Sequence, residues 1–170
     1  MTRGDFFYKW FWYGLAVVPV WLLEDMIFSH VSLFGVTPVL LPLTAIAVAV
    51  LEGTAGGAGF GMAMGLLCYA IWPHANPIVI PGMVLTGIAI GSAARYGLKQ
   101  NFVSFFLCSA VFLMLNDLVR MILGLLNQSA PLLAMIKVSL AESLVSLLVT
   151  PLIWLPLRKT FDRVGGTRLM

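Results

Sequence analysis

The chain has 170 residues and a formal net charge of +3, and while 61% of the residues are hydrophobic, only 10% are charged. Its mean hydropathy is +1.00. Soluble domains carry about a quarter charged residues, so this composition excludes an ordinary water-soluble domain and indicates an integral membrane protein. The basic residues lie at the ends of apolar runs, which favours membrane topology over a nucleic-acid-binding face as their explanation.

The apolar runs predict an all-α polytopic membrane protein with a single transmembrane domain over residues 1–170. A spanning helix needs about 20 mostly apolar residues, so the chain has room for a bundle of about six transmembrane helices. The predicted spans cover residues 10–28, 33–51, 54–72, 78–94, 102–126 and 131–157.

The first predicted span opens with a run of aromatic residues between Phe6 and Tyr13. Amphipathic rings prefer the headgroup level of a membrane, so this run is interpreted as an interfacial anchor. No small-residue cleavage site follows Leu23, which favours a retained helix over a signal peptide.

The third and fourth spans carry glycines at a spacing of four residues, after a tight connection predicted at Glu52 and Gly53. The recurring positions are Gly53, Gly57, Gly61, Gly65, Gly87 and Gly91. On a helix this spacing places small residues along one face, so that helix backbones can approach closely. We interpret the face as helix packing inside the protein, with a partner's helix as the second interpretation and ligand binding as the third. No phosphate-binding motif of the type G-x-x-x-x-G-K-[ST] accompanies it.

Four charges fall inside the last two predicted spans. They are Asp117, Arg120, Lys137 and Glu142. A charge near the centre of a spanning helix costs at least ~2.5 kcal/mol, so these residues are expected to face the bundle and pair. A turn near Gln128 makes Lys137 the expected partner of Asp117, whereas Arg120 and Glu142 would differ in depth by about 9 Å. The preferred interpretation is a compensated cluster near the outer interface; the alternative is a proton or ion path, or a polar contact for a partner.

The distribution of basic residues predicts the orientation of the chain. With both termini in the cytoplasm, eight of the ten Lys and Arg residues fall on the cytoplasmic side, as the positive-inside rule requires.

The sequence shows no pattern that indicates an enzyme. It contains no H-E-x-x-H, no G-x-S-x-G and no Cys/His spacing typical of a metal site. Cys68 and Cys108 lie inside apolar runs, where a thiol acts as a small hydrophobic group. We therefore expect no catalytic residues, no metal and no cofactor.

Three stretches carry a resemblance to a known family. A proline-led span, PVLLPLTAIAVAVLEG (38–53), runs into the glycine-rich GGAGFGMAMGLL (56–67), and the chain closes with ESLVSLLVTPLIWLPLRKTFDR (142–163). Together they resemble the rod shape-determining protein MreD family over nearly the whole chain. Two regions differ from that family: Leu66, Leu67 and Cys68 stand where an acidic residue is common, and Ser146 stands where an asparagine is common.

The resemblance implies a non-enzymatic component of the cell-elongation machinery in the bacterial cytoplasmic membrane. Such a protein would bind the membrane scaffold MreC. Through MreC it would reach the actin-like MreB filament and the enzymes that build lateral peptidoglycan.

The competing hypothesis is the substrate-binding subunit of an energy-coupling-factor vitamin transporter, which is similarly small, six-helical and glycine-rich. Those subunits commonly carry an Ala-x-x-x-Ala face on the first helix, whereas here Ala16 is followed four residues later by Val20. Asn127, Gln128 and the intramembrane charges are the polar groups available for a vitamin site. A third possibility, a proton-coupled transporter, would call for an inverted repeat, which the sequence does not show.

Overall fold

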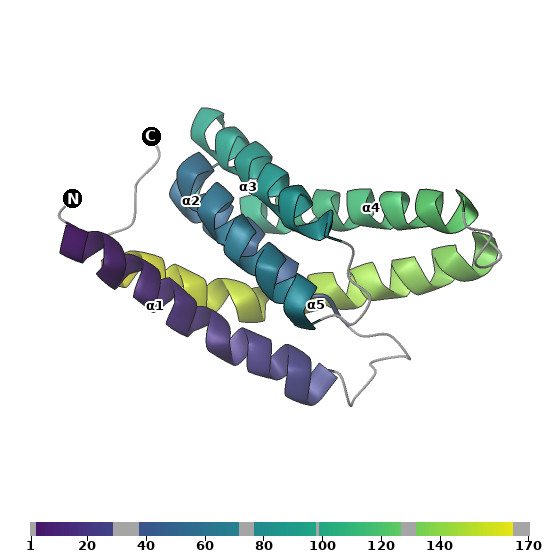
Figure 1. Cartoon of the computed structure of the whole chain (residues 1–170), viewed down its shortest axis with the longest axis horizontal. Helices are drawn as coiled ribbons and strands as arrows, with labels where there is room; N and C mark the ends of the chain where they lie inside the picture. Colours follow the sequence, from purple (N-terminus) through teal and green to yellow (C-terminus); the bar gives the residue numbers. More distant parts are fainter. Residues whose placement is uncertain (1–2, 29–37, 72–76, 98, 127–131, 165–170) are drawn as a thin grey trace.

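The computed structural model describes residues 3–28, 38–71, 77–97, 99–126 and 132–164 (Figure 1). Every regular element in these ranges is helical. The elements are α1 Arg3–Leu22, a π-helical continuation η1 Leu23–Phe28, α2 Leu41–Ile71, α3 Val79–Tyr96, α4 Phe102–Leu126 and α5 Leu132–Val164.

Four helices in the described part of the chain are long and apolar enough to cross a membrane. They cover Leu41–Ile71, Val79–Tyr96, Phe102–Leu125 and Met135–Val164. The chain is thus an all-α protein of the polytopic membrane class, and the predicted count of six spanning helices is not confirmed by the described residues. Residues 41–51 of one predicted span and 54–71 of the next lie in the single element α2, and α1 is not among the four. Charged residues, tryptophans and tyrosines in the first half of α1 lower its hydropathy.

Gly53 divides α2 into two segments, 41–52 and 54–71. Its φ of 78° and ψ of −161° lie in a region open to glycine and costly for other residues. A Cβ placed on Gly57 would lie 2.8 Å from the Cβ of Ala49, although residues eight apart in a straight helix are separated by about 12 Å. The chain therefore reverses at Gly53, and α2 is a tight helical hairpin.

The segment 41–52 forms the centre of the core, with every residue from Val39 to Gly53 buried. Its sequence is apolar on all sides, as expected of a helix surrounded by other helices. The neighbouring helices contribute Tyr13, Val17, Val20, Phe105, Leu113, Ile153 and Leu157 to the same core cluster.

The segment 54–71 packs against α3 through glycines at backbone-contact distance. A Cβ on Gly57 or Gly61 would come within 2.5 Å of the carbonyl oxygen of Gly87 or Met83, respectively, and one on Gly91 within 2.5 Å of the Gly53 carbonyl carbon. Ordinary contacts of a Cβ lie at 3.4–4 Å. These positions leave no room for a side chain, so the glycine face lies between α2 and α3.

The start of α1, the turn at Gly53 and the last turns of α5 lie at one end of the bundle, whereas the α4–α5 hairpin extends away from α2 and α3 (Figure 1). This end is called the Gly53 end below. Five of the basic residues assigned to the cytoplasmic side belong to helices that meet there, namely Lys9, Arg95, Arg158, Lys159 and Arg163, and a sixth, Lys99, lies in the connection that follows α3.

Candidate functional site

A buried ion pair lies beside the turn of the α2 hairpin. Lys9 of α1 pairs with Glu52, and the exposed fractions of the two residues are only 4% and 8%. The Tyr13 hydroxyl donates a hydrogen bond to the other carboxylate oxygen of Glu52 at 2.7 Å. Lys9 and Tyr13 are four residues apart, so they share one face of α1. A buried charge that lost its partner would destabilise the fold by several kcal/mol, which makes this contact a strong constraint on α1.

The same turn is also bonded to the connection between α3 and α4, and through it to α5. The Gln100 side-chain amide donates to the carbonyl oxygen of Leu51 at 2.7 Å, and Arg158 Nη1 donates to the carbonyl oxygen of Gln100 at 2.8 Å. Polar contacts from three parts of the chain thus fix the Gly53 turn.

The opposite end of the segment 41–52 is held by two side chains from other elements. Glu24 Oε2 of η1 accepts hydrogen bonds from the amides of Leu40 and Leu41 at 3.2 and 2.7 Å. Ser146 Oγ of α5 accepts one from the Val39 amide at 3.0 Å. The first amides of a helix have no partner within it, and a carboxylate also complements the positive end of the helix dipole. Both contacts therefore stabilise a helix start that is buried.

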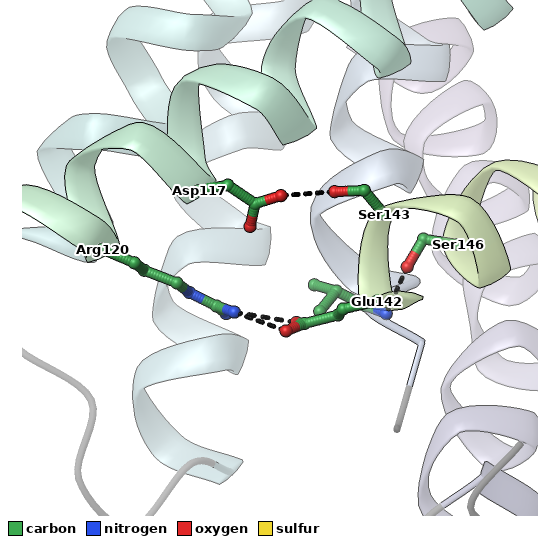
Figure 2. Close-up of polar contacts among 6 residues, drawn as sticks. Asp117, Arg120, Glu142, Ser143 and Ser146 are labelled. Atoms are coloured by element: carbon green, nitrogen blue, oxygen red, sulfur yellow. Dashed lines mark hydrogen bonds and ion pairs between the residues drawn. The ribbon is translucent and has the colours of Figure 1, made fainter. Parts of the chain in front are cut away.

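The charges of α4 and α5 pair differently from the prediction (Figure 2). Arg120 Nη1 donates to both carboxylate oxygens of Glu142 at 2.8 Å, and the Ser143 hydroxyl donates to Asp117. The Arg120 side chain is 42% exposed and that of Glu142 only 14%, so the carboxylate faces inward.

The predicted pair of Asp117 and Lys137 is not formed, and Lys137 is an exposed residue that makes no ion pair with any described residue. The reason is the register of the hairpin. The midpoint between Asp117 and Ser143 is residue 130 and that between Arg120 and Glu142 is residue 131, whereas the prediction placed the turn near residue 128.

An apolar trough of about 720 Å³ runs between α1 and the segment 54–71, open on one side. Its walls include Trp10, Gly14 and Trp21 of α1 and Ala55, Gly59 and Ala63 of α2. A Cβ on Gly14 or Gly59 would meet no atom within 4 Å, so the floor of the trough is open space.

The segment 54–71 therefore has two faces of small residues. Gly59 lies about 200° around the helix from Gly57, so the trough is on the side opposite to α3. Ala55, Gly59 and Ala63 repeat the four-residue spacing of the packed face, and that spacing admits a second helix at close range.

The two polar contacts that hold α1 and η1 to the hairpin were not predicted from the sequence. Glu52 was predicted only as part of a connection between spans, and Lys9 only as one of the cytoplasmic basic residues. The available signal was the i, i+4 spacing of Lys9 and Tyr13 at the entrance of an apolar span, which places two donors on one face.

The chemistry of the described residues is that of packing faces and fixed polar contacts. They contain no group of three or more His, Cys, Asp or Glu side chains that could hold a metal ion. Asn127 and Gln128, named as polar groups for a vitamin site, lie outside the described residues. Comparison with known proteins finds no matching family model, no matching curated protein and no matching solved structure.

Proposed function

We propose that this protein is a non-enzymatic membrane component of the bacterial cell-elongation machinery, which binds the scaffold protein MreC and so supports lateral peptidoglycan synthesis. The sequence resemblance to the MreD family supports the identity of the machinery. The trough between α1 and the segment 54–71 is the observation that carries the binding role.

The proposed topology has six crossings and both termini in the cytoplasm. The α2 hairpin supplies two passes, α1 with η1 one, and α3, α4 and α5 one each. Cytoplasmic termini are supported by the basic residues of the elements that meet at the Gly53 end.

The trough fits a single transmembrane helix. From Ala55 to Leu67 it extends over 13 residues, or about 18 Å and three helical turns. The opposite face of the same segment, with the same spacing of small residues, accommodates α3 at backbone contact. A scaffold protein that crosses the membrane once presents one helix, which can lie against Ala55, Gly59 and Ala63 in the same manner.

One observation favours the alternative function, a vitamin-binding subunit of an energy-coupling-factor transporter. Polar side chains from η1, α4 and α5 lie in the half of the bundle opposite to the Gly53 turn, where such a subunit would bind its ligand. However, Glu24 binds the start of α2, Asp117 accepts from Ser143, and Glu142 pairs with Arg120. These groups stabilise the protein's own helices, so the scaffold-binding function is preferred.

Co-purification tests the proposal. The tagged chain is co-expressed with the MreC of the same organism and recovered in mild detergent. Gly59→Leu fills the trough and should reduce MreC recovery at least about tenfold, because it blocks close helix approach. Met62→Leu, on the exposed side of the same segment, is the matched control and should retain it.

Thermal unfolding of each variant in detergent checks that both variants are folded. Undiminished MreC recovery with Gly59→Leu would exclude the trough as the binding surface. Recovery of coupling ATPases in place of MreC, together with binding of a vitamin by the purified protein, would support the transporter subunit instead.

A further inference from the structure

Two exposed cations lie on one face of α5 at the Gly53 end. Lys159 and Arg163 are four residues apart, a spacing that makes them neighbours on a helix surface. Neither makes an ion pair with a described residue, because the adjacent carboxylate, Asp162, lies 3.4 Å from Arg158 Nε instead. The two positive charges are therefore uncompensated within the described structure.

Aromatic residues of α1 border these cations. The guanidinium carbon of Arg163 lies 5.3 Å from the ring centroid of Trp12, a distance typical of a cation–π contact. The Trp12 Nε1–H is buried and has no acceptor among the described residues. Tyr8, whose ring centroid is 6.0 Å from that of Trp12, is exposed. Such residues are characteristic of the headgroup level of a membrane.

The same face of α5 continues toward the middle of the helix as an exposed apolar row. It consists of Leu155, Leu152 and Leu148, all of them exposed. Together with Lys159 and Arg163 these positions are spaced by three or four residues, so they follow one side of the helix. The surface is positive at the Gly53 end and apolar beyond it. It is therefore complementary to an amphiphile that has an anionic headgroup and an apolar chain.

We propose that this surface is a binding site for an anionic phospholipid of the adjacent leaflet. Lys159 and Arg163 contact the phosphate, and an acyl chain lies along Leu155, Leu152 and Leu148. Basic positions beside transmembrane helices attract anionic headgroups at this level of the membrane. Charge complementarity favours an anionic over a zwitterionic lipid, and the leucine row favours a lipid over free phosphate. The site is independent of the proposed binding of MreC.

Native mass spectrometry of the full chain, released from detergent with added lipid, tests the site. Wild-type protein should retain phosphatidylglycerol in preference to phosphatidylcholine, and excess inorganic phosphate should not displace the bound lipid. The double variant Lys159→Gln/Arg163→Gln should lower retention of phosphatidylglycerol at least about fivefold, since each cation contributes to attraction.

The matched control is Arg95→Gln/Lys99→Gln, which also removes two exposed cations at the Gly53 end. It should retain phosphatidylglycerol as the wild type does. Equal losses in both double variants would show general charge attraction and overturn the site, as would equal retention of the two lipids by the wild type. If the Lys159/Arg163 double variant does not fold, the two single Gln variants and the lipid preference of the wild type provide the same test.

Discussion

Lys9 and Glu52 form a buried ion pair that joins α1 to the turn of the α2 hairpin, across 43 positions of sequence. Tyr13 donates to the same carboxylate. A chain with so few charged residues thus places two of them in its interior, at the point where the core segment reverses. The contact sets the position of α1, and α1 forms one wall of the trough.

Removing one member of this pair should destabilise the protein strongly. Lys9→Met leaves the Glu52 carboxylate buried without its cation, so a loss of about 3–5 kcal/mol in the free energy of unfolding is expected. The double variant Lys9→Met/Glu52→Gln carries no stranded charge and should lose less than Lys9→Met alone. Thermal unfolding in detergent measures both, and a double variant less stable than either single variant would contradict the pairing.

The charges of α4 and α5 provide a test of register. Arg120→Met and Glu142→Gln should show a coupling energy of about 0.5–2 kcal/mol in a double-mutant cycle, because the two side chains pair directly. Asp117→Asn and Lys137→Met should be additive within about 0.5 kcal/mol, because these residues do not touch. Coupling between Asp117 and Lys137, with additivity between Arg120 and Glu142, would restore the register with a turn near residue 128.

The glycine face between α2 and α3 should not tolerate even a methyl group. A Cβ on Gly61 would lie 2.5 Å from the Met83 carbonyl oxygen, so Gly61→Ala must push the two backbones apart. Overpacking of this kind costs about 1–3 kcal/mol.

Gly82→Ala on α3 is the control for that substitution. A Cβ there meets no atom within 4 Å, so the change should be neutral or stabilising by up to about 1 kcal/mol. Equal melting temperatures for the Gly61 and Gly82 variants would mean that α2 and α3 are not in backbone contact.

The start of the buried segment 41–52 should depend on Ser146. Ser146→Ala removes the acceptor for the Val39 amide and should cost about 0.5–2 kcal/mol, the range observed for lost helix caps. Ser92→Ala removes a hydroxyl that bonds only to its own helix on an exposed surface, and it should change stability by less than about 0.5 kcal/mol. Thermal unfolding of the two variants side by side measures the difference.

Local spacing in the sequence was sufficient to predict the features that depend on one or two neighbouring segments. The i, i+4 glycines predict a packing face, and Gly53 after Glu52 predicts a tight connection, because both follow from helical geometry and glycine conformation. The same helical geometry argues against placing Lys137 in one inward-facing cluster with Glu142. Lys137 is five residues from Glu142, a rotation of about 140° on a helix, so the two residues do not face α4 together.

Contacts between distant segments could not be predicted in this way. The pair of Lys9 and Glu52 and the bonds of Glu24 and Ser146 to the start of α2 depend on how separate helices are placed in space. The pairing of α4 with α5 depends on the centre of their turn. A shift of two to three residues in that centre is enough to exchange one partner for another.

Cysteine cross-linking between this protein and MreC tests most directly whether the trough binds a transmembrane helix. Gly59→Cys is introduced after Cys68 and Cys108 are replaced by serine, and single cysteines are placed along the MreC helix. Cross-links should recur every three to four MreC positions, the period of a helix lying in the trough. Leu115→Cys, on the exposed surface of α4, should give none. Cross-links from Leu115→Cys with none from Gly59→Cys would contradict the account.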